Sequence, residues 1–270
     1  MNKPFLVSHE VPVDFLYESR EFNDYDYCLP HLLDQNEAYL EYFQDSKKTG
    51  RYIIMDNSLH ELGKAYDSER LLYWINKLEP NVFIVPDVWQ NGFATMRNAK
   101  KWAEYRWEIG KIPPTVELMV VGQGSSFDEL INCLHVMIEY YEYKKVAISY
   151  GASWYNDVVP HPNSYVGKML GRIYTVSELR KKFWMKDIKV HLLGCALPQE
   201  FSYYTNPEFS FIKSIDTSNP IIHGLLGIEY DEYGLNSKSS IKIDTIEKTV
   251  NKDIIYRNVE KFNKLLTYAY

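Results

Sequence analysis

The stretch TVELMVVGQG (115–124), followed by SSFDELINCLHVMIEYYE (125–142), decides the fold class. Its first part is a continuous apolar run, which is typical of a strand buried on both faces of a sheet. The second part has apolar residues at helical spacing, and Ser125 or Ser126 can cap its first turn. A buried strand that leads directly into a helix indicates an α/β protein with a parallel sheet.

The same alternation recurs over most of the chain. Six apolar runs of this kind lie at 51–58, 81–89, 115–124, 144–151, 189–196 and 211–216. Further helices are predicted over 67–79, 92–110, 176–184 and 251–268. Asp67 or Ser68 is a suitable N-cap for the first of these, and Gly110 is expected to end the second.

Two more strands would complete a closed barrel. KPFLVSHE (3–10) can supply one at the N-terminus, and LLGIEY (225–230) can supply one after the last clear run. We therefore predict an α/β fold, a (β/α)8 TIM barrel with loop insertions, formed by a single domain over residues 1–270. An open, doubly wound sheet is the alternative, but no glycine-rich dinucleotide fingerprint follows the first strand.

Two segments interrupt the alternation. Residues 152–175 form a long irregular stretch, which is unusual for a barrel loop without a function. Residues 225–250 are polar and rich in lysine, and we expect them to form an excursion before the closing helix.

The composition excludes several classes of protein. A formal net charge of −6 argues against a protein that coats nucleic acid nonspecifically, but it does not exclude a local basic groove. The three cysteines, Cys28, Cys133 and Cys195, form no CxxC pair, so neither a zinc site nor a disulfide framework is predicted. A reducing, cytoplasmic compartment is expected. No apolar stretch approaches the ~18 residues that span a bilayer, so no membrane partner is expected.

Polar side chains stand at the C-terminal ends of the predicted strands. They are Asp56-Asn57-Ser58, Asp87, Gln123 between two glycines, Ser149-Tyr150-Gly151, Leu193-Gly194-Cys195, and Asp216. The C-terminal ends of the strands converge on one face of a barrel, where the active site is built. Any one aspartate could be a helix cap or a turn former, but three carboxylates and a carboxamide together favour a catalytic site. His60, His191 and His223 are too scattered to predict a metal site, and His191, inside a strand, is expected to be a hydrogen-bonded core residue.

Five segments between about 50 and 224 resemble, in matching order, the guanine transglycosylases of tRNA, and more closely their DNA-acting relatives from phages and bacterial genomic islands. MDNS resembles the family's Asp-Ser-Gly-Gly strand end, VPDVW the strand whose aspartate binds the base, and VVGQG the family's V-Q-G-G. HLLGCALPQE and SIDTSNPIIHG are the most specific segments, with L-x-G-x-x-x-P and D-x-x-x-P-x-x-x-G in the right order. Three features depart from the family: Ser58-Leu59 replaces one Gly-Gly pair, Ser149-Tyr150 replaces the other, and the last segment lacks its arginine.

The resemblance implies exchange of a guanine in a polynucleotide for a free 7-deazaguanine, such as preQ0, without strand cleavage. Asp216 would be the nucleophile that forms a covalent ester with the sugar, and Asp56 the general acid and base. The remaining implied roles concern recognition of the base. Asp87 would accept from guanine N1–H and the exocyclic amine, and Gln123 would contact the O6 edge with help from the backbone near Ser149 and Tyr150. Leu193 and Gly194 would form the pocket floor, and Tyr150 would cover the other face of the base. Apart from the 7-deazaguanine co-substrate, no cofactor and no metal are implied.

The same resemblance favours DNA as the polymer, because the cysteine-rich zinc subdomain of the tRNA enzymes is missing. The target guanine would be flipped from a duplex or presented in a single strand. Arg172, Arg180, Lys181, Lys182 and the lysine-rich 238–248 region are the candidates for phosphate contacts, and the alternative is that these charge runs are solvent-exposed faces with no such role. A phage-encoded enzyme of this kind would work in the cytoplasm of the host cell.

Other functions remain open. A tRNA-acting enzyme, an N-glycosidase that lets water complete the reaction, and a small-molecule hydrolase on the same barrel could use the same acids. A catalytically inactive nucleic-acid-binding relative is disfavoured because Asp56 and Asp216 are both present.

Overall fold

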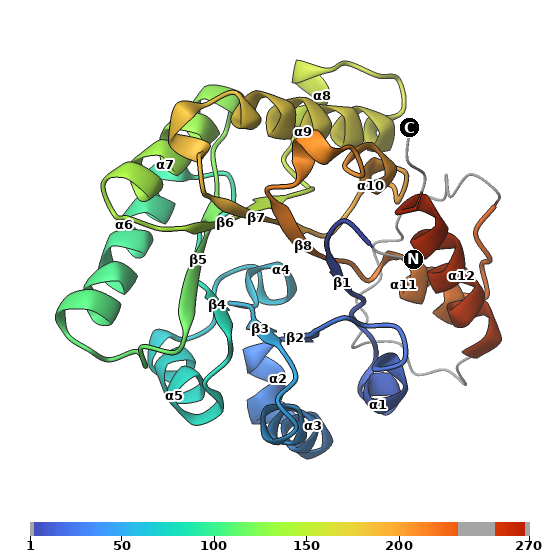
Figure 1. Cartoon of the computed structure of the whole chain (residues 1–270), viewed down its shortest axis with the longest axis horizontal. Helices are drawn as coiled ribbons and strands as arrows, with labels where there is room; N and C mark the ends of the chain where they lie inside the picture. The colour runs from blue at the N-terminus through green and yellow to red at the C-terminus, as the bar shows by residue number, and fades with distance from the viewer. Residues whose placement is uncertain (1–2, 232–251, 268–270) are drawn as a thin grey trace. The chain divides into compact units, whose positions relative to one another are not determined.

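The computed structural model describes residues 3–231 and 252–267. In this part of the chain eight parallel strands form one sheet in the order β1-β8-β7-β6-β5-β4-β3-β2 (Figure 1). Their bounds are β1 Leu6–Ser8, β2 Asp26–Cys28, β3 Ile53–Met55, β4 Val82–Ile84, β5 Glu117–Gly122, β6 Lys145–Ser149, β7 Lys189–Leu193 and β8 Ile212–Asp216. Strands and helices alternate along the chain, so the predicted α/β (β/α)8 class is confirmed.

The helices between these strands vary in length from one turn to almost five. They are α1 Leu16–Ser19, α2 Pro30–Gln35, α3 Glu37–Lys48, α4 Leu59–Leu62, α5 Ser68–Leu78, α6 Gly92–Ala103, α7 Phe127–Glu139, α8 Tyr155–Val158, α9 Ser164–Arg180, α10 Glu200–Tyr203, α11 Asn219–Leu225 and α12 Lys252–Leu265. Short 3-10 turns occur at η1 Val13–Phe15, η3 Phe183–Met185 and η4 Pro207–Phe209, and a π-helical turn, η2 Glu104–Glu108, continues α6. None of the described helices is both long and apolar enough to span a membrane.

The chain forms two compact units. Unit 1 consists of residues 1–23, 149–185 and 190–270, and unit 2 consists of residues 24–148 and 186–189.

Unit 2 contains β2 to β6 with α2 to α7. The three residues of β3 and those of β4 are all buried, which explains why these runs are apolar without alternation. Asp67 caps α5 by accepting from the backbone N–H groups of Glu69 and Arg70, and Ser126 caps α7, as predicted. The buried face of α5 includes Leu71 and Ile75, and each such side chain contributes about 1.5–3 kcal/mol by leaving water.

Unit 1 contains β1, β7 and β8 with α1 and α8 to α12. The strand β1 pairs in parallel with β8, so the N-terminal KPFLVSHE segment does supply a strand, as predicted. A hydrophobic cluster joins α11 and α12, which lie side by side in Figure 1, to η1; its buried members are Phe15, Ile221, Leu225, Ile255 and Val259. Through this cluster α12 is packed against α11 and η1.

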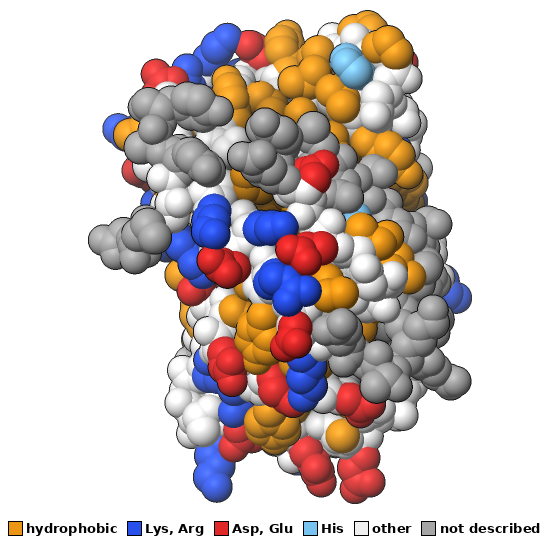
Figure 2. Space-filling view, turned by 90° about the vertical axis from the view of Figure 1, so that its right-hand side faces the viewer, with side chains coloured by type: hydrophobic (Ala, Val, Ile, Leu, Met, Phe, Trp, Pro, Cys, Tyr) orange, Lys and Arg blue, Asp and Glu red, His pale blue; other side chains and the backbone are white. Residues whose placement is uncertain are grey.

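Charged side chains of both signs intermingle on the face that carries α12 (Figure 2). Lys252 pairs with Glu18, and both Arg257 and Lys261 pair with Glu229. The basic residues of α12 are therefore neutralised by neighbouring carboxylates rather than forming a surface of one sign.

The eighth strand differs from the prediction. Residues 225–230 form no strand; Leu225 ends α11 and packs toward α12 instead. The missing strand is β2, whose sequence Asp-Tyr-Cys is short and polar and therefore lacks an apolar run. Its Asp26 is buried and neutralised by Arg51, with 2.8 Å between Asp26 Oδ2 and Arg51 Nε.

The predicted irregular stretch 152–175 is also mostly helical. It contains α8 and most of α9, which begins well before the predicted basic helix at 176–184. Gly167 and Gly171 obscure the helical pattern of α9, but a side chain at Gly171 would overlap the backbone of Tyr155 in α8. These glycines permit the close approach of the two helices. Most of the predicted excursion at 225–250, including all of 238–248, lies outside the described residues.

Candidate active site

Unit 2 places three of the predicted residues at the C-terminal ends of its strands. Asp87 follows β4 and Gln123 follows β5, and the two side chains are in direct contact: Gln123 Nε2 donates to Asp87 Oδ2 at 2.6 Å. Asn57 Nδ2 donates to the other oxygen, Asp87 Oδ1, at 2.8 Å. Both Asp87 and Gln123 are buried. A buried carboxylate is therefore held by one amide on each side.

The orientation of the Gln123 amide is fixed at both of its ends. The backbone N–H of Gln90 can only donate, and it donates to Gln123 Oε1 at 2.9 Å. The amide nitrogen must then face Asp87, whose carboxylate can only accept. The site consequently presents a carboxylate acceptor beside a carboxamide whose N–H2 group points toward it.

The environment of Asp87 changes its acidity. Burial raises the pKa of the Asp87 carboxyl above its ordinary value, because a buried carboxylate loses its hydration. The hydrogen bonds from Asn57 and Gln123 act in the opposite direction and offset part of this effect. A ligand that donates further hydrogen bonds to Asp87 would favour the carboxylate form.

Asp56 belongs to a tight turn after β3. Its Oδ2 accepts from the backbone N–H of Ser58 at 3.0 Å, and Asn57 Oδ1 accepts from the backbone of Leu59 at 3.0 Å. Ser58 has φ = 61°, in the left-handed region that favours glycine. The Ser58 hydroxyl also lies 2.8 Å from Nδ1 of the buried His31.

In unit 1, Asp216 is the last residue of β8 and is buried. Its Oδ1 lies 3.0 Å from Nε2 of His191, and Nδ1 of the same ring lies 2.8 Å from the hydroxyl of Ser214. His191 is on β7, directly opposite Ser214 in the strand register. The histidine is a hydrogen-bonded core residue, as expected, and it also orients the predicted nucleophile.

Buried polar atoms without a protein partner lie close to Asp216 in the chain or the sheet. Ser8 is the register partner of Asp216 on β1, and its Oγ has no hydrogen-bond partner among the described residues. The same holds for Nδ2 of Asn219, three residues after Asp216. Because buried polar atoms are normally satisfied, these two are candidates to contact a ligand or water. His9, next to Ser8, is kept neutral: burial lowers its pKa to about 3.

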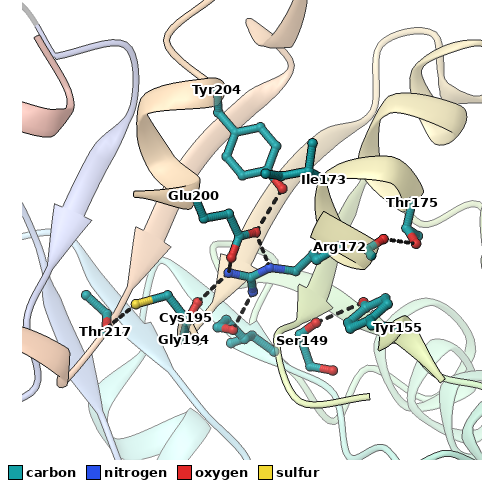
Figure 3. Close-up of polar contacts among 12 residues, drawn as sticks. Ser149, Tyr155, Arg172, Ile173, Thr175, Gly194, Cys195, Glu200, Tyr204 and Thr217 are labelled. Carbon is teal, nitrogen blue, oxygen red and sulfur yellow. Dashed lines mark hydrogen bonds and ion pairs between the residues drawn. The ribbon is translucent and has the colours of Figure 1, made fainter. Parts of the chain in front are cut away.

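Arg172 holds the backbone of Leu193 and Gly194, the predicted pocket floor. Figure 3 shows Arg172 between Gly194 and Glu200. The guanidinium donates from Nη1 to the carbonyl of Leu193 at 2.8 Å and from Nη2 to that of Gly194 at 2.7 Å. It also pairs with Glu200, with Nε to Oε1 at 2.5 Å and Nη2 to Oε2 at 2.9 Å, and Tyr204 donates to the same carboxylate. Both members of this ion pair are 0% exposed.

The predicted phosphate contact of Arg172 is therefore wrong. Its Nε, Nη1 and Nη2 groups donate to backbone carbonyls and a buried carboxylate, and the side chain is fully buried, so it cannot reach a polynucleotide on the surface. Burial alone disfavours the charge, but attraction by Glu200 outweighs this and raises the pKa of Arg172. The role of Arg172 is to fix the backbone after β7.

Tyr150 lies directly against Gly194. A Cβ atom added to Gly194 would approach Cδ1 of the Tyr150 ring to 2.5 Å, and Gly194 has φ = 58°. The predicted gap for a base between Gly194 and Tyr150 is thus filled by the tyrosine ring itself. The neighbouring Ser149 carbonyl accepts from the hydroxyl of Tyr155 at 3.0 Å. A base on the Gly194 floor would require the Tyr150 ring to move.

The other predicted basic residues lie far from the acid of unit 1. Arg180, the last residue of α9, pairs with Glu208 in η4, which precedes β8, whereas Asp216 ends β8. Lys181 follows Arg180 and pairs with Glu178, and Lys182 comes next. Helix α9 places Arg180 about 12 Å beyond Arg172. The predicted phosphate role of these three residues is not supported, because they lie near the opposite end of β8.

Each unit thus gathers a separate group of the predicted residues. Unit 2 holds Asp56, Asp87 and Gln123, and unit 1 holds Asp216, Tyr150, Leu193 and Gly194. The meeting of Asp56 with Asp216 across a sugar joins residues of different units and stays a prediction. Within residues 3–231 and 252–267, no three His, Cys, Asp or Glu side chains gather as metal ligands would.

Three residues of the site were not identified from the sequence. Asn57 was noted at a strand end but was given no role, and that position is the one sequence feature that pointed to the site. His191 was assigned to the core because a strand residue gives no indication of its cross-strand partner. Glu200 carries no sequence signal, because its pairing with Arg172 joins residues 28 positions apart.

Comparison with known proteins adds little to this description. No protein-family model matches the chain, and no curated protein matches it. A chain from the solved structures of two fungal beta-1,4-galactanases aligns with 97% of this chain and 100% of its own length, at a TM-score of 0.48 and 10% sequence identity. The fold class follows from the strands and helices described above: the chain is a (β/α)8 protein.

Proposed function

We propose that the protein is a DNA-guanine transglycosylase, which replaces a guanine in DNA by a free 7-deazaguanine such as preQ0. The contact between Asp87 and Gln123 is the observation that carries the proposal. Guanine has N1–H and amine donors next to the O6 acceptor on one edge. A carboxylate beside a carboxamide N–H2 group is the complementary pair.

The same pair explains how one pocket could accept both the leaving and the entering base. A 7-deazaguanine keeps the N1–H, amine and O6 groups of guanine, and it differs only on the opposite edge of the ring. Adenine lacks the N1–H and amine donors of guanine and would leave the buried Asp87 with only its hydrogen bonds from Asn57 and Gln123. A site of this kind can reject the wrong base by about 10⁴-fold.

The proposed chemistry begins at Asp216. Its carboxylate attacks C1′ of the sugar, the bond from C1′ to N9 of guanine breaks, and Asp56 transfers its proton to the departing base. The ester between Asp216 and the sugar conserves the glycosidic bond energy until the 7-deazaguanine enters. Asp56 then removes the N9 proton of that base, N9 bonds to C1′, and the Asp216 carboxylate is released. His191 engages Oδ1 of Asp216, so we assign Oδ2 to the attack.

The polymer is assigned to DNA because the three scattered cysteines of this sequence offer no counterpart to the cysteine-rich zinc subdomain of the resembled tRNA enzymes. The turn at Asp56 is compatible with the resemblance, because Ser58 stands where the resembled family has glycine and its φ of 61° lies in the left-handed region that favours glycine.

The test is exchange of radiolabelled guanine or 7-deazaguanine into single-stranded DNA, duplex DNA and tRNA in separate reactions. Label should enter or leave DNA with the wild-type protein, and the Asp216→Asn variant should be slower by more than about 10³-fold. Mass spectrometry of the denatured protein should detect a covalent DNA adduct in the wild type but not in Asp216→Asn. Incorporation into tRNA alone would overturn the choice of polymer, and release of guanine without incorporation would identify an N-glycosidase.

A further inference from the structure

One side of α6 and the loop before it carries aromatic and basic side chains at a spacing of four residues. Trp89 is 44% exposed and Phe93 is 67% exposed, Arg97 and Lys101 are exposed, and Tyr105 is half-buried. Side chains four residues apart lie on adjacent turns of a helix, so those from Phe93 onward form a continuous ridge. We refer to these five residues as the aromatic–basic track.

The track begins at the pair that would bind the base. Trp89 is two residues after Asp87, and the backbone N–H of the next residue, Gln90, donates to Gln123 Oε1 at 2.9 Å. The side chain of Thr95 accepts from the backbone of Val88 at 3.0 Å, which fastens the loop to α6. The first aromatic residue of the track is thus rigidly connected to the Asp87–Gln123 contact.

The charge of this helix suits a polyanion. Helix α6 contains Arg97, Lys100 and Lys101 but no aspartate or glutamate. In the described part of the chain none of these three cations forms an ion pair, in contrast to the basic residues of α12. Unpaired cations on one helix face attract phosphates at a smaller desolvation cost than paired ones.

Aromatic rings and cations also lie close together along the track. The Arg97 guanidinium carbon lies 5.8 Å from the centre of the Phe93 ring, and Nζ of Lys101 lies 5.3 Å from that of Tyr105. At its far end the track opens into a groove of about 670 Å³ whose lining includes the cations Lys77 and Lys111. From Phe93 to Tyr105 the helix rises about 18 Å, a length that matches roughly five stacked nucleotides.

We propose that the aromatic–basic track binds the single-stranded nucleotides that flank the target guanine. Bases stack on Trp89 and Phe93, and phosphates pair with Arg97 and Lys101. This assignment rests on the proposed function and replaces the phosphate contacts expected at Arg172 and Arg180.

The test measures the binding of a fluorescently labelled single-stranded oligonucleotide by anisotropy, with all variants in the Asp216→Asn background to prevent turnover. Replacing both Trp89 and Phe93 by alanine should weaken binding at least tenfold, because each stacked base contributes ~1–3 kcal/mol. The Arg97→Gln/Lys101→Gln double variant should reduce the slope of log affinity against log salt by about 1.4. Arg97→Lys should retain that slope.

The matched control is Trp107→Ala, which removes an equally exposed tryptophan (51%) beyond the far end of α6 and should bind like the parent. If the wild-type protein exchanges bases and the Asp216→Asn parent binds the oligonucleotide, but the track variants bind equally well, the track is overturned while the proposed function stands. If the wild-type protein binds no polynucleotide, the proposed function fails and the track with it. Equal competition by polyglutamate would identify a general anion-binding surface and overturn base stacking.

Discussion

Nε2 of His191 lies 3.0 Å from Oδ1 of Asp216, and the other ring nitrogen lies 2.8 Å from the hydroxyl of Ser214. A carboxylate can only accept, so Nε2 carries the hydrogen, and in the neutral imidazole Nδ1 then accepts from the serine hydroxyl. Ser214, His191 and Asp216 thus form a buried relay in which the serine fixes the tautomer and the histidine fixes the carboxylate. In the proposed reaction His191 is a positioning residue rather than a catalytic one.

Replacement of His191 by phenylalanine should lower kcat about 10- to 100-fold, since a hydrogen bond to a charged group contributes roughly 1.5–3 kcal/mol. The KM for the free base should change little, because the proposed base contacts, Asp87 and Gln123, belong to unit 2. His191→Gln, whose amide can still donate to Asp216, should recover part of the rate. Steady-state kinetics of base exchange separates the two parameters, and an equal loss in both variants would contradict the positioning role.

The stability of the protein should depend on the ionisation of Asp87. Because its folded-state pKa is raised, the folded protein retains this proton more tightly than the unfolded chain, whose value is ~3.9. The stabilisation is present at low pH and is lost as the pH rises through the folded-state pKa. The free energy of unfolding of Asp87→Asn, relative to wild type, should therefore increase as the pH rises above about 4.

Urea denaturation of both proteins across this pH range measures the effect, and parallel curves would contradict it. Asp56→Asn serves as the comparison, because it removes another buried strand-end carboxyl of the same unit. Guanine binding by wild type should weaken as the pH falls through the raised pKa, because a protonated Asp87 can no longer accept from both guanine donors.

Arg172 and Glu200 should be strongly coupled. The Arg172→Met variant leaves Glu200 buried without its partner and removes donors from the carbonyls of Leu193 and Gly194, so we expect a loss of about 3–5 kcal/mol. The Arg172→Met/Glu200→Met double variant should lose less than the sum of the two single variants. A double-mutant cycle from denaturant unfolding tests this, and additive losses would contradict the pairing.

Gly194 should tolerate no side chain while Tyr150 occupies its present position. Gly194→Ala combines a left-handed backbone, which costs an alanine about 1–2 kcal/mol, with the approach of the new Cβ to the Tyr150 ring. Thermal stability should fall, and Gly194→Ala/Tyr150→Ala should recover the part caused by the ring. No recovery in the double variant would show that backbone strain alone is responsible.

Much of the fold could be predicted because local patterns specify it. Buried parallel strands such as β5 are apolar without interruption, and side-chain oxygens such as those of Asp67 and Ser126 mark where helices begin. The strand β2 was not predicted because it contains no apolar run; its Asp26 is stabilised instead by an ion pair with Arg51. Most of helix α9 was not predicted because Gly167 and Gly171, which are required for contact with α8, weaken the helical pattern of the sequence.

The candidate site was predictable only in part, for a related reason. Strand ends identified Asp87 and Gln123, because the ends of parallel strands share one edge and position in the chain is sufficient. The burial of Arg172 could not be inferred, since an isolated arginine on a helix gives no sign of a carboxylate 28 residues away. The relay from Ser214 through His191 depends on strand register, which periodicity alone does not reveal.

Under the proposed function Asp87 and Gln123 would contact the ring edge that the outgoing and incoming bases have in common, so the pocket would have little means of preferring one over the other. The exchange breaks one bond between C1′ and N9 and forms another, so its equilibrium would be set by the two bases and not by the pocket. Its net direction would follow from the ratio of the two free bases in the cell, and a sustained supply of the 7-deazaguanine would be needed to drive the polymer to full modification.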